Sequence, residues 1–484
     1  MSFPAADLLE AIPADARRIL VIGEELLRHQ EGWQARNPLT VIEAATGPLT
    51  GHIPKDTGPT ADAAILSVDE LGDSAAAAVK RTAACLEVGG TIALFGKTHR
   101  SVAAIQRLGA MLTADGMVLD RVIGGQSPGG HGIARFLRPA GSLPQLRVMA
   151  HQVAANSGPL SGSVVRVRLA EPFEQLQSLP GVRCTIFADG QPLPATDANA
   201  ANVLVVQRKL FPKPELYLQP AYALNYIVVA EFDDLIMDEQ IFTAARYKEN
   251  MAGFHAIQVS TQALAEQMRQ YHPEVGVFGN HLPRIRPAPT KASAPIQIFL
   301  AAYARQAACR EIMHTYREIL AGYGDSVVTV VVGDRAFFDA LQPLNSRFLP
   351  LLAYSDYVQE LGRSHVAVLP LTDNQFDRCK TDLKFIECAE AGTAVLASHV
   401  VYGETVRTGE TGYVYRNQEE FRWQLRRLLD EASTRDQLAA NAHRYVQEHR
   451  ALANQVRRQY DWFLSLAERR AELAQGIKDR LRLL

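Results

Sequence analysis

The sequence lacks several features that would point to particular classes of protein. No run of about 18 apolar residues occurs anywhere in its 484 residues, so it predicts no membrane-spanning helix. The opening stretch, MSFPAADLLEAIPADARR, carries acidic side chains where a signal peptide would carry basic ones, and no apolar core follows it. We therefore expect a soluble protein, or one at most peripheral to a membrane.

Cysteines are few, and neither sign of charge is in excess. The five cysteines form no CxxC pair, which fits a reducing compartment and argues against structural zinc; they are Cys85, Cys184, Cys309, Cys379 and Cys388. A net charge of −2, with 21% charged residues, gives no electrostatic reason to expect a nucleic-acid partner. We expect a cytoplasmic protein whose polar partner is recognised locally.

What the chain does have is length and a repeated alternation of short apolar runs with helical patterns. A chain of 484 residues exceeds one hydrophobic core, and its 47% of hydrophobic residues can fill several. The alternation is typical of parallel, doubly wound sheets. We predict an α/β fold with domains over residues 1–145, 160–290 and 293–448, a linker over residues 140–160, and a helical tail over residues 449–484.

The stretch from Pro370 to Ser398 carries the strongest functional signal. It follows a short apolar run, His365–Pro370, of the length of a buried strand, and ligands of open α/β sheets gather at the carboxyl ends of such strands. Lys380, Lys384 and Glu387 then fall within about two turns of a predicted helix. Lysines at a helix start suit a diphosphate, and a carboxylate further along can take the hydroxyls of a ribose. The pattern favours a nucleotide-sugar site, although such a triplet is also typical of an ordinary charged helix face.

At these residues the sequence resembles the retaining glycosyltransferases of the GT-B fold, with their group 1 type C-terminal domain. The family carries two glutamates around this helix; Glu387 matches the second, and Cys379 stands in place of the first. The resemblance runs from about Ile298 to Arg450. It implies a pair of Rossmann-like domains and metal-independent transfer of a sugar, without a cofactor, from a nucleotide-sugar donor to a glycan, lipid-linked or protein acceptor.

The resemblance also implies roles for single residues. Because the departing nucleoside diphosphate gains negative charge, fixed cations would stabilise it, and Lys380, Lys384 and Arg305 are expected there, with Arg310 as a second choice. Glu387 would hold the ribose. Further contacts with the donor are expected from Gly333, Asp334, Asp373, Asn374, Phe376, Thr381 and the segment Tyr354–Tyr357. For Gly333 and Asp334 a plain turn is an equal alternative.

The segment over residues 160–290 resembles, more weakly, the acceptor-side half of the same fold. Strands are expected at Val164–Arg168, Cys184–Phe187, Val203–Gln207, Ile227–Glu231 and Ala256–Val259. Asp233 and Asp234 follow a strand end and are expected to position an acceptor hydroxyl, unless they are solvated loop charges. With Lys380 they are the catalytic candidates. Arg208 and Glu231 are parallel candidates for the cleft. Prolines after Asn280 indicate a hinge before the last domain.

Residues 1–145 faintly resemble the class I S-adenosylmethionine methyltransferases. Gly23 follows the first predicted strand, Glu43 ends the second, and LEVGGTIALFG matches a further element. The turn Gly23-Glu-Glu-Leu-Leu27 has one glycine where the family places several, and its two carboxylates would repel that of the cofactor. We therefore expect an inactive domain. A bifunctional protein that also methylates and a non-catalytic glycosyltransferase-like scaffold remain alternatives.

Two further segments leave alternatives open. The glycine-rich Gly124–Gly130 is expected to be a flexible loop rather than a phosphate loop, because no clear helix follows it. The basic tail beyond His449, near Trp462 and Phe463, could rest on an anionic membrane or pack across the domains with its charged face solvated.

Overall fold

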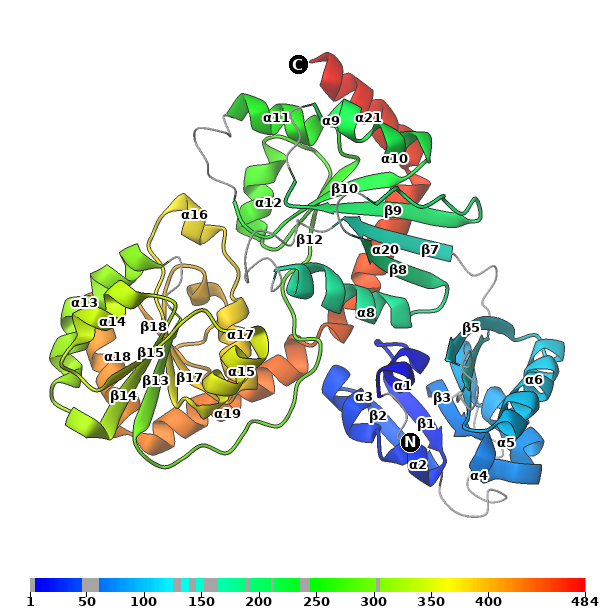
Figure 1. Ribbon diagram of the computed structural model, residues 1–484, viewed down its shortest axis with the longest axis horizontal. Helices are drawn as coiled ribbons and strands as arrows, with labels where there is room; N and C mark the ends of the chain where they lie inside the picture. Colours follow the sequence, from blue (N-terminus) through cyan, green and yellow to red (C-terminus); the bar gives the residue numbers. More distant parts are fainter. Residues whose placement is uncertain are drawn as a thin grey trace.

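The computed structural model describes residues 5–45, 61–124, 132–138, 145–151, 164–187, 191–209, 213–235, 244–301 and 305–483. They form three α/β units, each built on a six-stranded sheet. Figure 1 shows the first unit at the lower right, the second at the top and the third at the left. The predicted α/β fold, a pair of Rossmann-like units preceded by a third, is confirmed. No helix of the described residues is long and apolar enough to cross a membrane.

The first unit has the strand order β2-β1-β3-β4-β6-β5, in which β6 runs antiparallel to both neighbours. Its sheet is covered by helices on both faces. Its strands are β1 Arg18–Ile22, β2 Val41–Ala45, β3 Ala61–Ser67, β4 Leu86–Gly96, β5 Val118–Gly124 and β6 Gly132–Leu137. Its helices are α1 Ala5–Ala11, α2 Glu24–Leu27, α3 Gln30–Arg36, α4 Val68–Leu71, α5 Ala75–Ala84 and α6 His99–Ala114. Residues 125–130 of the predicted flexible loop lie outside the described residues.

The second unit has a fully parallel sheet in the order β12-β11-β10-β9-β7-β8. Its strands are β7 Gln145–His151, β8 Val182–Phe187, β9 Ala200–Gln207, β10 Ile227–Phe232, β11 Ala256–Val259 and β12 Val275–Val277. Its helices are the π-helical turn η3 Arg166–Ala170, α8 Glu171–Ser178, α9 Pro214–Tyr217, α10 Gln219–Ala223, α11 Ala244–Ala252 and α12 Gln262–Arg269.

Two sequence predictions for this unit are wrong. The linker predicted over residues 140–160 contains β7, which lies between β8 and β9 in the sheet. The Gly, Pro and Ser residues around this short strand hid its pattern. Val164–Arg168, predicted to be a strand, is helical, because Leu169, Phe173 and Leu176 bury one helical face against the sheet. Its alternation of valine and arginine imitates the two-residue period of a strand.

The third unit is also parallel throughout, in the order β15-β14-β13-β16-β17-β18. Its strands are β13 Ile296–Ala301, β14 Val327–Val332, β15 Ser346–Leu349, β16 Val366–Leu369, β17 Ala394–Ser398 and β18 Tyr413–Tyr415. Its helices are α13 Gln306–Leu320, α14 Arg335–Leu341, α15 Tyr354–Arg363, α16 Gln375–Arg378, α17 Leu383–Glu390, α18 Gln418–Asp430 and α19 Ala432–His449. The strand, helix and strand predicted around Lys380 are β16, α17 and β17.

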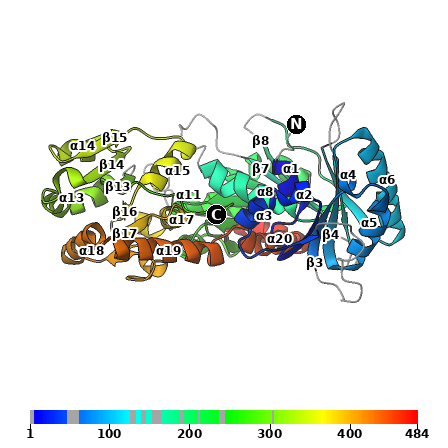
Figure 2. The ribbon, with the colours of Figure 1, turned by 90° about the horizontal axis from the view of Figure 1, so that it is seen from below.

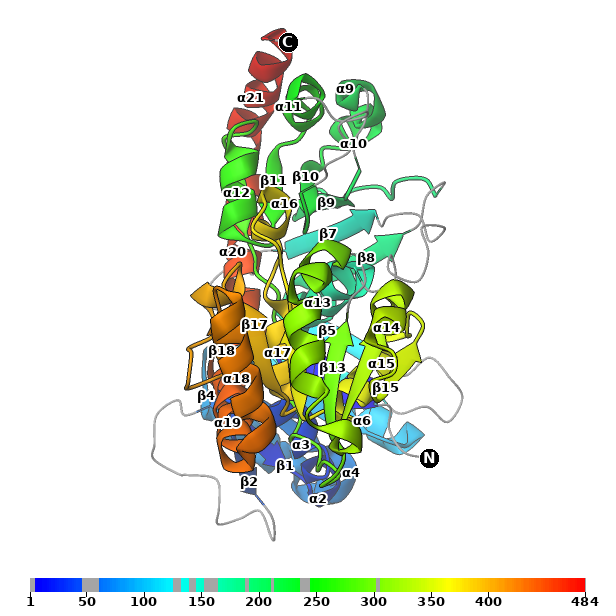
Figure 3. The same ribbon diagram turned by 90° about the vertical axis from the view of Figure 1, so that its left-hand side faces the viewer.

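The C-terminal helices return to the second unit. Val456, Tyr460 and Phe463 of α20 (Ala453–Glu468) belong to its hydrophobic core, and α21 (Arg470–Arg482) continues alongside it (Figure 2, Figure 3). The chain thus crosses between the two units twice, and the crossings meet in a β-bridge between Leu282 and Ala451. The predicted hinge after Asn280 lies at this junction. The packing favours the interdomain alternative for the tail; contact with a membrane stays a prediction.

The first unit is tied to the second by a buried ion pair. The guanidinium of Arg135 lies 2.5 Å from Asp120 and is fully buried, as Asp120 nearly is. Arg135 also donates to the carbonyl of Ser178, at the end of α8, at 2.5 Å, and Asp120 accepts from the backbone N–H of Gly181 at 2.8 Å. Arg135 and Asp120 therefore pair with each other in the first unit, and each also makes a hydrogen bond to the backbone of the second unit. These contacts fix how the two units dock.

Candidate functional site

The carboxyl ends of the second and third sheets meet at the boundary between these units. Thr261, which follows β11, donates its hydroxyl to the carbonyl of Cys379, in the segment after β16, at 3.0 Å. Gln375 of the third unit donates to Gln267 of the second at 2.7 Å. Such sheet ends are where open α/β proteins bind ligands. The boundary is therefore the first place to look for a site.

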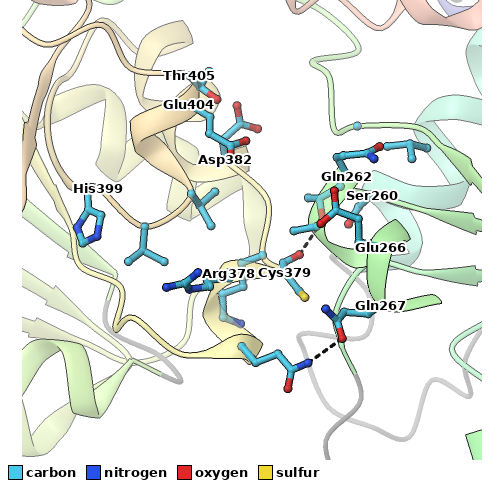
Figure 4. A pocket seen from close by; sticks show the side chains of 18 of the residues that line it. Ser260, Gln262, Glu266, Gln267, Arg378, Cys379, Asp382, His399, Glu404 and Thr405 are labelled. Atoms are coloured by element: carbon cyan, nitrogen blue, oxygen red, sulfur yellow. Dashed lines mark hydrogen bonds between the residues drawn. The ribbon is translucent and has the colours of Figure 1, made fainter. Parts of the chain in front are cut away.

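A cavity of about 900 Å³ lies at this boundary. Figure 4 shows Ser260, Gln262, Glu266 and Gln267 on its second-unit side, facing third-unit residues that include Arg378, Asp382 and His399. Its lining is dominated by hydroxyl, amide and charged groups, which suits a polar ligand. Of the predicted site residues, Asp373, Asn374 and Lys380 line it.

Three predicted cations converge beside this cavity. Burial lowers the pKa of Lys380, and the nearby charge of Arg305 lowers it further while Asp234 opposes the change. Burial also lowers the pKa of Lys384 to about 8, and Arg305 and Lys380 both add to this effect. Arg305 donates to the carbonyl of Pro370 at 2.9 Å, so its guanidinium is fixed at the end of β16. Among the described residues, no carboxylate forms an ion pair with Lys384. An anion would relieve the repulsion within this cluster.

Lys380 connects the cluster with the two predicted aspartates. Its ammonium nitrogen lies 3.7 Å from Asp234 and 4.0 Å from the centre of the Phe376 ring. Arg208 forms ion pairs with both Asp233 and Asp234, the latter at 3.1 Å. Burial raises the pKa of Asp234, and the adjacent charge of Asp233 raises it further. The carboxylates are thus held between cations of both units, as expected for residues in a cleft.

Glu387 is buried on α17 among aromatic hydroxyls. Tyr357 donates to its carboxylate at 3.1 Å, and the Tyr354 hydroxyl is a second hydrogen-bond partner. Burial raises the pKa of Glu387, whereas the charge of Lys384, one turn earlier, opposes the shift. The structure therefore brings Glu387 together with the two tyrosines of the segment Tyr354–Tyr357, which is expected to contact the donor.

Other predicted donor contacts have structural partners. Asp334 is buried and caps α14 by accepting from the N–H of Phe337 at 3.0 Å, while Gly333 has a φ of 81° that favours glycine. Asn374 caps α16 in the same way at 2.9 Å, and Asp373 forms an exposed ion pair with Arg378. These contacts neither use nor require a ligand.

The remaining candidates are outside the cleft. Glu231 is completely buried and lies 2.7 Å from Arg168, which is itself only 4% exposed. Arg310, the second choice for the diphosphate, is exposed on α13. The loop residues 302–304, just before Arg305, lie outside the described residues.

A buried network that sequence reasoning missed converges on Asn280 at the hinge. Arg168 donates to the side-chain oxygen of Asn280 at 2.8 Å, and Asn280 in turn donates to the hydroxyl of Thr381 at 3.0 Å. Arg450 donates to the Asn280 carbonyl at 2.8 Å and pairs with Asp382. The segment between Lys380 and α17 is thereby fixed to the hinge. Only the prolines beside Asn280 marked this place in the sequence; no pattern indicates a buried arginine.

A strained turn forms one wall of the cavity. Val401 has a φ of 68° and a ψ of −55°, and Tyr402 donates its N–H to the carbonyl of Val400 at 2.8 Å, which closes a γ-turn. A β-branched residue rarely adopts a positive φ, and such strain is found most often at functional sites. The sequence gives no signal for it.

The turn after β1 in the first unit is filled by the protein itself. Gly23 has a φ of 128°, and the N–H groups of Glu24 and Glu25 donate to the carboxylate of Glu70 at 2.7 and 3.2 Å. Glu43, part of the faint resemblance to methyltransferases, forms an exposed ion pair with Arg18. The backbone donors that a cofactor would use are therefore already occupied by an internal carboxylate.

Comparisons with protein families and with solved structures find similarity to known proteins. Residues 305–460 match a family described as glycosyl transferase-like. That match includes Arg305, Lys380, Lys384 and Glu387. No curated protein is recognisably similar to the sequence.

Several solved glycosyltransferase structures resemble the chain at low sequence identity. They include TarM of S. aureus (12% identity, 54% of each chain, TM-score 0.43) and a glycosyltransferase from Rickettsia africae (11% identity, 67% of this chain and 99% of that one, TM-score 0.49). HepE of Anabaena, in complex with UDP and glucose, shares 12% identity over 66% of this chain and 100% of its own, with a TM-score of 0.46. The chain spans about half the length of TarM.

Proposed function

We propose that this protein is a glycosyltransferase that moves a sugar from a nucleotide-sugar donor to a hydroxyl-bearing acceptor, a glycan being the first choice. The observation that carries the proposal is the cluster of Arg305, Lys380 and Lys384 at the carboxyl ends of two facing parallel sheets. The glycosyl transferase-like match over residues 305–460 supports it. UDP and glucose, which are bound in the HepE structure, are an example of the nucleotide and sugar that we propose as ligands.

Each group of residues around the donor has its own role in this proposal. Arg305, Lys380 and Lys384 stabilise the negative charge that develops on the diphosphate as the bond to the sugar breaks. Glu387, fixed by Tyr354 and Tyr357, holds the ribose. The donor occupies the third unit and the acceptor enters from the second, and no metal or other cofactor takes part.

Asp233 and Asp234 lie on the acceptor side of Lys380. Arg208 and Lys380 hold them in place, so they can orient an acceptor hydroxyl toward the sugar. The anomeric configuration is retained, as the family resemblance implies.

A non-catalytic scaffold is the second candidate, and Cys379 is the observation that favours it. Burial raises the pKa of the Cys379 thiol to about 11, so at neutral pH this side chain is uncharged where the resembled family has a carboxylate. The thiol cannot contact a sugar hydroxyl as an ionised glutamate would. Formation of any glycosylated product separates the two candidates.

Methyl transfer by residues 1–145 is not part of the proposal, because Glu70 occupies the donors of the turn after β1. We propose that this unit is an inactive, methyltransferase-like scaffold.

A thermal-shift screen tests the proposal. The plate holds uridine, guanosine, adenosine and thymidine diphosphates, their common sugars, S-adenosylmethionine and S-adenosylhomocysteine. A ligand that binds only the folded state raises the melting temperature. We expect a rise with one nucleoside diphosphate series, followed by transfer of its sugar to a glycan acceptor. A rise with the adenosyl compounds alone would move the activity to the first unit.

A further inference from the structure

Arg166 reaches from the second unit to the aromatic wall around Glu387. It begins the π-helical turn η3, and its guanidinium carbon lies 3.9 Å from the centre of the Tyr354 ring, at the start of α15 in the third unit. Its Nε lies 2.6 Å from Glu171 of α8. The guanidinium is therefore anchored in its own unit and stacked on a ring of the other, an arrangement that suits the flat, delocalised group of arginine.

Tyr354 transmits this contact to Glu387. Its ring stacks on Tyr357 at a centroid separation of 6.1 Å, and both tyrosine hydroxyls are hydrogen-bond partners of the Glu387 carboxylate. A movement of Tyr354 would therefore change the position of one of these two hydroxyls. Tyr354 therefore contacts both Arg166 and Glu387.

The surroundings of Arg166 are rich in buried carboxylates. A cavity of about 360 Å³ at this boundary is lined by residues that include Arg166, Glu171, Tyr354 and Glu390. Glu171 is 8% exposed and Glu387 is 6% exposed. Burial raises the pKa of both, and the charge of Arg166 opposes the shift in each case. If the units separated here, Glu387 would lose the nearby charge of Arg166 and Tyr354 would lose its stacking contact, whereas Glu171, in the same unit as Arg166, would keep its ion pair.

We propose that Arg166 is a positioning residue that holds the second unit closed on the third and thereby keeps Tyr354 and Glu387 in the geometry that binds the donor. The inference rests on the proposed function for its link with the donor. The contact between Arg166 and Tyr354 does not depend on the proposed function, because it joins two units of the protein without a ligand.

The matched control for this contact is Arg427. It lies 5.3 Å from the centre of the Trp423 ring and pairs with Glu431 at 2.9 Å, entirely within the third unit. Its side chain is 37% exposed, against 43% for Arg166. Arg427→Ala therefore removes the same kinds of contact without affecting the boundary between units.

The experiment compares Arg166→Ala, Arg166→Lys and Arg427→Ala with the unaltered full chain by small-angle X-ray scattering and by calorimetric titration with nucleoside diphosphates. Without ligand, Arg166→Ala should have a larger radius of gyration. Its affinity for the bound nucleotide should fall about tenfold, because less of the protein is in the competent closed state. Arg166→Lys keeps the charge without the planar stack, so it should recover part of both effects. Arg427→Ala should change neither.

An unchanged scattering profile and an unchanged nucleotide affinity in Arg166→Ala would overturn the inference, as would equal effects of Arg427→Ala. If the unaltered protein binds no nucleotide, the proposed function fails, and the scattering comparison still decides the contact: expansion specific to Arg166→Ala supports it, and no expansion refutes it. A thermal melt of each variant identifies general unfolding. A melting temperature of Arg166→Ala below that of Arg427→Ala would indicate such unfolding and count against a positioning role.

Discussion

The ammonium nitrogen of Lys380 lies 3.7 Å from a carboxylate oxygen of Asp234, across the boundary between the second and third units. This contact joins a residue of the proposed donor side to one of the acceptor side. Since Lys380 is also repelled by Arg305, it has both a counter-ion in the other unit and a reason to bind a further anion. The site is therefore assembled only when the two units are together.

Replacement of Lys380 by alanine should weaken binding of a nucleoside diphosphate about 10- to 100-fold, since a charge-assisted hydrogen bond contributes about 1.5–3 kcal/mol. Lys478→Ala, an exposed lysine of α21, is the control and should bind normally. Isothermal titration calorimetry measures both. Equal affinities in the two variants would show that Lys380 does not contact the anion.

Binding of the diphosphate should weaken as the pH rises above about 8. Burial, together with Arg305 and Lys380, lowers the pKa of Lys384 in the free protein to about 8. Below that pH the side chain is already cationic. Above it, the anion must bind together with a proton. Affinity should then fall by up to about tenfold per pH unit. Lys384→Arg keeps its charge and should remove this break in the pH profile. A flat profile in the unaltered protein would contradict the placement of Lys384.

Asp334 should matter for stability and not for the donor. Because its side chain caps α14, Asp334→Ala should lower the free energy of unfolding by about 1 kcal/mol, whereas Asp334→Asn retains a capping oxygen and should cost less. Urea denaturation measures the cost, and calorimetry should find the nucleotide affinity unchanged in both. A loss of affinity in Asp334→Asn at normal stability would instead support the donor contact that the sequence suggests.

The buried pair of Asp120 and Arg135 should be strongly coupled. Arg135→Met leaves a buried carboxylate without its partner and should destabilise the protein by about 3–5 kcal/mol, and Asp120→Ala should have a comparable cost. The double variant should cost clearly less than the sum of the two. Chemical denaturation of the three variants gives the coupling energy, and simple additivity would show that the pair does not hold the first unit in place.

The sequence was most informative where a local pattern and the tertiary structure agree. The strand, helix and strand around Lys380 and Glu387 follow from apolar runs and helical spacing. The structure places Lys380 in the lining of the boundary cavity and buries Glu387 further along α17. Asp334 shows the limit of this reasoning, since an acidic residue after a strand can cap a helix or contact a ligand; the structure shows the cap, and the contact with the donor stays a prediction for experiment.

The features that were missed depend on contacts between distant parts of the chain. Arg168 is buried because Glu231 balances its charge and Asn280 accepts one of its hydrogen bonds, and neither lies near it in the sequence. The helical conformation of Val164–Arg168 is likewise decided by burial against the second sheet, which overrides the strand-like alternation. Val401 adopts a positive φ that its side chain disfavours locally.

The most direct test of the account is a calorimetric titration of the unaltered chain, Glu387→Ala and Lys384→Met with uridine, guanosine, adenosine and thymidine diphosphates at neutral pH. We expect one nucleoside diphosphate to bind the unaltered chain. Lys384→Met should lose affinity for the diphosphate, and Glu387→Ala should lose affinity for the nucleoside diphosphate but not for pyrophosphate. Failure of all four to bind, or equal binding to the three proteins, would contradict it.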